Sequence, residues 1–290
     1  MNIIDRFKLG LKLTGKSWSV LRADGSLALF PVISGLATIC LFTVLWAPAL
    51  GLGLVDIETT NAAAGQSGQS VNVLGWILVA LTAYLATVVA VFCNVALAGC
   101  VAKSLQGENT SLRDGFLIAR SRIKQILAWS LIATVVSMII RTIQERGGIF
   151  GAIVGMIGGV AWNLATLFVV PVIALEGVGP IDALKHSAQT FKARWGEGLI
   201  GNTLIGLVTG LMIMTCLALA IGGVILLNPL GAAAVISWLA LCLVTMLAVA
   251  AIMAALNQVF NTSLYIFSKN GQAAGPFTEQ EFAAAFRSKK

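Results

Sequence analysis

Four asparagines stand inside long apolar stretches of the chain, where few other polar residues occur. They are Asn94, Asn163, Asn257 and Asn261. An amide in apolar surroundings must find a hydrogen-bond partner, because burying it unpaired costs free energy. These side chains could line a polar cavity for a small solute or a lipid, or they could hydrogen-bond neighbouring helices. Asn257 and Asn261 are four residues apart, so a helix would place them on one face.

Residues and motifs of known enzymes are missing from the sequence. His186 is the single histidine, which argues against a histidine-based metal site. The five cysteines lie in apolar runs without Cys-x-x-Cys spacing, as expected of buried small side chains. Patterns of P-loop proteins, serine hydrolases and zinc proteases do not occur. We expect Glu176 to cap a helix or to pair with Arg194. The sequence therefore predicts a non-enzymatic protein that needs no cofactor and no metal.

Glycines recur every fourth residue in one apolar run, and an asparagine continues their register. These residues are Gly147, Gly151, Gly155, Gly159 and Asn163. Glycine at this spacing strips one helix face of side chains, so that a neighbouring backbone can approach closely. The pattern predicts a helix-packing face. Its neighbour could be another helix of the same chain or a second copy of the protein.

Six runs without Asp, Glu, Lys or Arg dominate the chain. Hydrophobic residues make up 58% of it and charged residues 11%, and the mean hydropathy is +0.92. A membrane-spanning helix needs roughly 20 apolar residues, and five of the runs reach that length alone. The third run gains its length from charged flanks that can reach the membrane surface. The runs are Leu27–Val55, Val71–Val101, Ile126–Ile140, Gly147–Leu175, Leu199–Leu227 and Leu230–Phe267. The chain is thus predicted to be an all-α, polytopic membrane protein.

Basic residues fall almost entirely on one side of these six runs. When the connecting segments are assigned alternately to two sides, 17 of the 19 lysines and arginines share the side of the N-terminus, and only Arg141 and Arg146 lie opposite. The positive-inside rule places the basic side and both termini in the cytoplasm. The formal net charge of +7 therefore indicates membrane topology rather than binding to nucleic acid. We expect a multi-pass protein of a bacterial or archaeal cytoplasmic (inner) membrane.

Amphipathic segments are predicted on the same side. Residues 2–22 place lysines on one helical face and apolar residues on another, as in a helix that lies in the headgroup layer. Similar segments precede the third and fifth runs, which suggests a threefold pseudo-repeat of an interfacial helix followed by a helical hairpin. Residues 1–270 would form the membrane domain, and residues 271–290 a short cytoplasmic helix. Expected contacts with lipid head groups are Lys8, Lys12, Lys16, Lys185, Lys192 and Arg194.

Short motifs along nearly the whole chain carry a family resemblance. They include Leu27-Ala-Leu-Phe-Pro-Val-Ile, Phe168-Val-Val-Pro-Val-Ile-Ala-Leu-Glu176, Ala183-Leu-Lys-His-Ser187 and Arg194-Trp-Gly-Glu197. Together they resemble a prokaryotic integral membrane family classified as a domain of unknown function, number 6159. The family is loosely similar to the membrane region attached to some glycerophosphodiester phosphodiesterases, whose catalytic domain this chain lacks. The resemblance implies six membrane helices and transfers no functional residues.

Two functions fit these patterns. The first is assembly in the membrane, with itself or with a membrane-protein partner, through the glycine face. The second is a channel or transporter for a small solute or lipid, with the asparagines as cavity lining. In both cases membrane lipids are the expected surroundings of the protein.

Overall fold

The structure, a computed structural model, describes residues 3–51, 73–193, 197–228 and 231–278. Most of the described chain is helical, and it contains no strand. In order, the elements are α1 (Ile3–Ala23), the short 3-10 helix η1 (Gly25–Ala28), α2 (Leu29–Gly51), α3 (Val73–Ser104), α4 (Leu112–Ser121), α5 (Ile123–Arg146), α6 (Gly148–Ala165), α7 (Val169–Glu176), α8 (Pro180–Ala193), α9 (Glu197–Leu227) and α10 (Ala232–Asn270).

Six segments of the described chain are long and apolar enough to cross a membrane. They are Gly25–Gly51, Val73–Ser104, Ile123–Arg146, Gly148–Glu176, Val208–Leu226 and Ala232–Asn270. Each contains one of the six apolar runs of the sequence or most of it, so the prediction of an all-α protein with six spans is confirmed. The threefold pseudo-repeat and the membrane-surface position of the amphipathic helices stay predictions.

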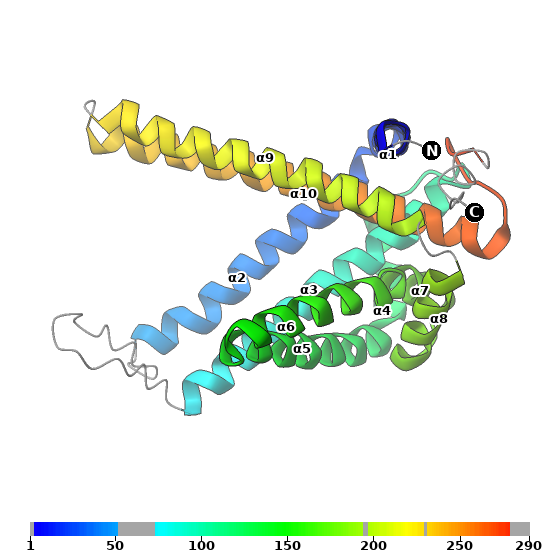
Figure 1. Cartoon of the computed structure of the whole chain (residues 1–290), viewed down its shortest axis with the longest axis horizontal. Helices are drawn as coiled ribbons and strands as arrows, with labels where there is room; N and C mark the ends of the chain where they lie inside the picture. Colours follow the sequence, from blue (N-terminus) through cyan, green and yellow to red (C-terminus); the bar gives the residue numbers. More distant parts are fainter. Residues whose placement is uncertain (1–2, 52–72, 194–196, 229–230, 279–290) are drawn as a thin grey trace.

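Short helices and the ends of the described chain gather at one end of the molecule. Figure 1 shows α1, α4, α7 and α8 together at the right, where α3 and α10 finish and α2 and α5 begin. We call this the basic end, because the basic residues away from it in the described chain are Arg141 and Arg146, at the turn between α5 and α6. Two arms diverge from it in Figure 1, the α9–α10 pair and the group of α3, α5 and α6, with α2 between them.

Packing is densest near the basic end. Helix α3 lies at the centre of the bundle and contacts α2, α4, α5, α7 and α10. Its last third is almost completely buried, from Val95 to Ala102. Helix α10, with 39 residues, is about 58 Å long, nearly twice the thickness of a hydrocarbon core. It packs against α1, α2, α3, α7 and α9. Its buried residues lie toward the basic end, from Ala255 to Phe267.

Local sequence sets the ends of several helices. The hydroxyl of Ser111 accepts a hydrogen bond from the Asp114 backbone N–H, and the Asp114 carboxylate accepts one from Ser111, which together form a capping box at the start of α4. The hydroxyl and backbone N–H of Ser111 lower the pKa of Asp114. At the far end, Gly147 and Gly148 form the tight turn between α5 and α6, and Gly148 adopts a positive φ of 58° that side chains resist.

Candidate functional site

A lateral groove of about 520 Å³ lies between α2, α3 and α10. Pocket volumes of roughly 300–1,000 Å³ are usual for small-molecule sites. Its walls are almost entirely apolar, and several of the wall residues are widely exposed, including Leu36 at 60% and Val244 at 64%. The groove is thus open sideways to the lipid that surrounds the spans. The lining residues are Pro31, Val32, Ser34, Gly35, Leu36, Ile39, Asn94, Val244, Leu247, Ala248, Ala250, Ala251 and Ala254.

The groove has the length of one membrane leaflet. It runs from Pro31 to Ile39 along α2 and from Val244 to Ala254 along α10. These stretches are about 12–15 Å long at 1.5 Å per residue, and half of a hydrocarbon core is about 15 Å. Alanine dominates the α10 wall, so the small side chains of this helix create the space.

Of the four asparagines singled out in the sequence, Asn94 lines the groove. Asn257 and Asn261 lie closer to the basic end on α10, and Asn261 is only 7% exposed. Within the described residues their Oδ1 atoms have no hydrogen-bond partner. Asn163 is exposed in the last turn of α6. The structure therefore does not bring the four side chains into one cavity.

The glycine face of α6 packs against α5 of the same chain. A Cβ atom at Gly151 would collide with the backbone carbonyl oxygen of Ile143, and one at Gly155 would collide with the side chain of Gln144. At Gly159 it would lie 3.8 Å from Ile140 Cγ2. Gly147 belongs to the turn that precedes α6. Gly151 thus lies directly against the α5 backbone, whereas Gly155 and Gly159 face α5 side chains.

The fourth span is interrupted near the basic end. Helix α6 ends at Ala165 and α7 begins at Val169, which leaves backbone groups without helical partners between them. The hydroxyl of Ser187, completely buried on α8, donates to the Ala165 carbonyl at 2.6 Å and accepts from the Phe168 N–H at 3.0 Å. One side chain thus bridges the break and ties α8 to the span. Pro171 falls in the first turn of α7, where proline is tolerated.

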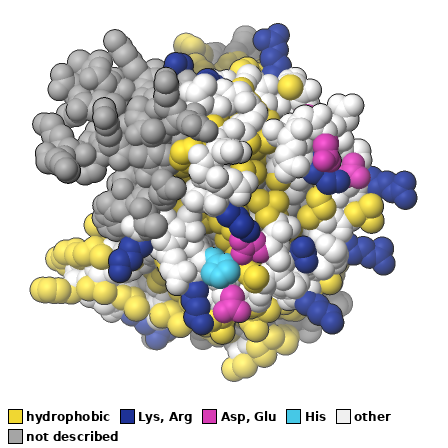
Figure 2. Space-filling view, turned by 90° about the vertical axis from the view of Figure 1, so that its right-hand side faces the viewer, with side chains coloured by type: hydrophobic (Ala, Val, Ile, Leu, Met, Phe, Trp, Pro, Cys, Tyr) yellow, Lys and Arg dark blue, Asp and Glu magenta, His cyan; other side chains and the backbone are white. Residues whose placement is uncertain are grey.

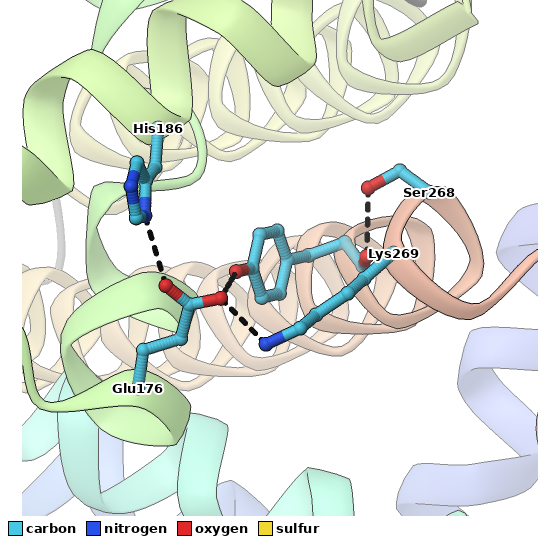
Figure 3. Close-up of polar contacts among 5 residues, drawn as sticks. Glu176, His186, Ser268 and Lys269 are labelled. Carbon is cyan, nitrogen blue, oxygen red and sulfur yellow. Dashed lines mark hydrogen bonds and ion pairs between the residues drawn. The ribbon is translucent and has the colours of Figure 1, made fainter.

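A polar cluster forms where α7, α8 and α10 meet at the basic end. The Glu176 carboxylate accepts hydrogen bonds from the Tyr265 hydroxyl and from Lys269 Nζ, both at 2.6 Å, through Oε1. Its Oε2 lies 2.9 Å from His186 Nδ1. Figure 3 shows Glu176, His186 and Lys269 pointing toward one another from the three helices. The cluster joins the end of α10 to α7 and α8.

The residues of this cluster were found only in part from the sequence. The sequence predicts that Glu176 caps a helix or pairs with Arg194, and Arg194 lies outside the described residues. Tyr265 and Lys269 are 89 and 93 residues away from Glu176, and no sequence pattern connects them. Ser187 is part of an ordinary amphipathic segment. A polar residue on the apolar face of such a segment was the one available signal for it.

Several lysines are predicted to contact lipid head groups, and those that the structure describes lie at the basic end. Figure 2 shows Lys and Arg distributed over this face around His186 and the neighbouring carboxylates. Lys12 and Lys192 are exposed, Lys16 is partly buried, and Lys185 lies 3.7 Å from Asp182. The side chain of Lys8 and the whole of Arg194 lie outside the described residues.

Metal chemistry has no candidate site in the part of the chain that the structure describes. No group of three or more His, Cys, Asp or Glu residues is placed there to hold an ion. The polar residues of the groove wall are Ser34 and Asn94. The geometry offers shape and hydrogen bonding to a bound molecule.

Comparison with known proteins places the chain in a family. No curated protein and no solved structure matches it. The model of a family of unknown function, DUF6159, matches residues 73–275. This region covers 203 of the 290 residues, from the start of α3 to just beyond α10. The chain is therefore a member of the DUF6159 family of unknown function, and its described residues contain six apolar segments of membrane-spanning length.

Proposed function

We propose that this protein is a non-enzymatic, multi-pass membrane protein that binds a membrane lipid, with an acyl chain in the groove between α2, α3 and α10. The observation that carries the proposal is the groove itself, which is apolar, open to the side and as long as one leaflet. A lipid can enter it directly from the membrane. Its head group would then point to the basic end, because the α2 wall of the groove lies mostly between that end and the middle of the first span.

Affinity for one lipid over bulk lipid must come from shape and from Asn94. Lipid tails are as apolar as the groove wall, so burial of apolar surface contributes little in a membrane. The Asn94 amide is the exception, because in apolar surroundings it gains free energy from any hydrogen-bonding group that it meets. An ester carbonyl of a glycerolipid can accept from the Asn94 amide. The groove therefore favours a lipid over an unfunctionalised hydrocarbon.

The orientation in the membrane follows from charge. The basic end carries nearly all of the described lysines and arginines, and the positive-inside rule assigns such an end to the cytoplasm. The bound lipid would then belong to the cytoplasmic leaflet of the inner membrane. Assembly through the glycine face has less support, because α5 of the same chain already covers that face.

Filling the groove should remove the lipid. Replacing Ala251 by phenylalanine places a ring in the groove, whereas the same change at the exposed Ala240, outside the groove, leaves it open. We expect native mass spectrometry of the detergent-purified protein to show one retained lipid for the wild type and for Ala240→Phe. Ala251→Phe should retain it about tenfold less.

Equal lipid retention by both phenylalanine variants, with unchanged melting temperatures, would contradict the proposal. Loss in both variants would also contradict it, since a general effect of added rings would then explain the result.

A further inference from the structure

A second hollow opens at the basic end, away from the groove. It has a volume of about 160 Å³ and shares no lining residue with the groove. Its walls come from the end of α7, from α8 and from the end of α10, and they include the Glu176 cluster. The lining residues that matter below are Glu176, His186, Gln189, Thr190 and Lys269.

The cluster is arranged with His186 and Lys269 outermost. The Glu176 side chain is 16% exposed, whereas those of His186 and Lys269 are 45% and 56% exposed. Both carboxylate oxygens are engaged, one by Lys269 and Tyr265 and the other by His186. Glu176 thus fixes the positions of the imidazole and the ammonium group while lying beneath them.

Hydrogen-bond donors remain for a molecule in the hollow. The Lys269 ammonium has three N–H groups and gives one to Glu176. The second ring nitrogen of His186, Nε2, is a further donor when the imidazole carries both protons. Thr190 and Gln189 add a hydroxyl and an amide to the wall. A set of donors that includes an exposed ammonium group suits an oxyanion, because charge-assisted hydrogen bonds are the stronger kind.

The position of the hollow along the membrane-crossing segments also favours an oxyanion. Two of the membrane-crossing segments end there, one at Glu176 and the other at Asn270. The hollow therefore lies at the boundary between the apolar spans and the basic end, the layer in which phospholipid phosphates lie. Lysines and arginines surround it on the face shown in Figure 2, and such a surface attracts anionic lipids.

We propose that this hollow binds a phosphate group, through Lys269 and His186 with Thr190 and Gln189 beside them. The Glu176 carboxylate acts as a positioning group. Its charge is balanced by Lys269, and Tyr265 and His186 contact its two oxygens. The phosphate can belong to a phospholipid head group or be free phosphate, since both present the same oxygens. This site is independent of the acyl-chain groove.

The test compares three probes on the purified full-length protein in detergent. They are dioleoylphosphatidylglycerol, dioleoylglycerol, which has the same chains without phosphate, and inorganic phosphate. Lys269→Gln should weaken binding of dioleoylphosphatidylglycerol about tenfold. Lys124→Gln removes an equal charge from an exposed position on the same end. This variant should change the lipid affinity by no more than about twofold. Lys269→Arg should restore most of the binding.

Two further measurements keep the test decisive. Thr190→Val alters the hollow without touching the Glu176 hydrogen bonds, so a loss of binding in this variant supports the site even if Lys269→Gln destabilises the protein. Repeating the titration in the Ala251→Phe background separates the hollow from the groove, because that change should affect both lipids alike.

Displacement of phosphatidylglycerol by inorganic phosphate would identify free phosphate as the ligand, and resistance to displacement would identify the lipid head group. Both results support the site. Equal weakening by Lys269→Gln and Lys124→Gln, or unchanged binding in Thr190→Val and Lys269→Gln, would overturn it and leave the groove proposal untouched.

Discussion

Replacing Gly151 by alanine is expected to lower the free energy of unfolding by about 3 kcal/mol, at the upper end of what overpacking costs. The new methyl group would collide with the backbone carbonyl oxygen of Ile143 on α5. Backbone cannot rotate away as a flexible side chain can, so α5 and α6 must move apart at this contact. Reversible unfolding in mixed micelles of dodecylmaltoside and SDS measures the effect.

Gly158→Ala is the matched control on the same helix. A Cβ atom there has no neighbour within 4 Å, so alanine should be neutral or slightly stabilising through its higher helix propensity. Equal stabilities of the two variants would contradict the described packing of α6 on α5. If Gly151→Ala instead kept full stability and reduced the size of the purified particle, the glycine face would lie between copies of the chain.

Replacing Glu176 by alanine is expected to lower the free energy of unfolding by about 2 kcal/mol. The Tyr265 side chain is part of a residue only 3% exposed, and its hydroxyl would lose its acceptor at 2.6 Å. Leaving a buried polar group unpaired costs about 1–3 kcal/mol. The contribution of Lys269 is smaller, because its side chain is 56% exposed and remains hydrated. The same unfolding measurement applies.

Glu145→Ala provides the comparison. Glu145 also holds an ion pair, with Arg141 at 2.7 Å, but the two side chains are 61% and 78% exposed. Such surface pairs contribute roughly 0–1 kcal/mol, so the change should be small. Similar losses in the two glutamate variants would show that the Glu176 cluster does not hold α10 to α7 and α8.

The spans were predictable from the sequence because their physical requirement is local. A membrane-crossing helix needs consecutive residues without charge, and the sequence displays that directly. The third span illustrates the limit. The uncharged run covers Ile126–Ile140, whereas α5 extends over Ile123–Arg146. Charged side chains at its ends are compatible with the helix because they can reach the membrane surface.

The break between α6 and α7 was not predictable from apolarity alone. Both halves are equally apolar, and the interruption is stabilised by Ser187, which comes 22 residues after Ala165. Pro171 was the local cue, since proline favours the first turn of a helix over its interior. Long-range partners of this kind are set by how helices pack, which periodicity in one segment does not encode.

For the asparagines, too, the sequence predicts one property and helix packing decides another. Their position inside apolar runs could be predicted, but their separate environments could not. Asn94 reaches the groove because alanines on α10 leave space opposite it, whereas Asn261 is buried where α10 packs tightly near the basic end. Which of the two environments each residue meets depends on the neighbouring helix.

The most direct test of the lipid-binding groove is a cryo-electron microscopy map of the protein in lipid nanodiscs. The groove between α2, α3 and α10 should contain one elongated density, about as long as a leaflet, that reaches Asn94. A map in which α2 and α10 close upon each other, or in which a helix of a second copy fills the groove, would contradict the account.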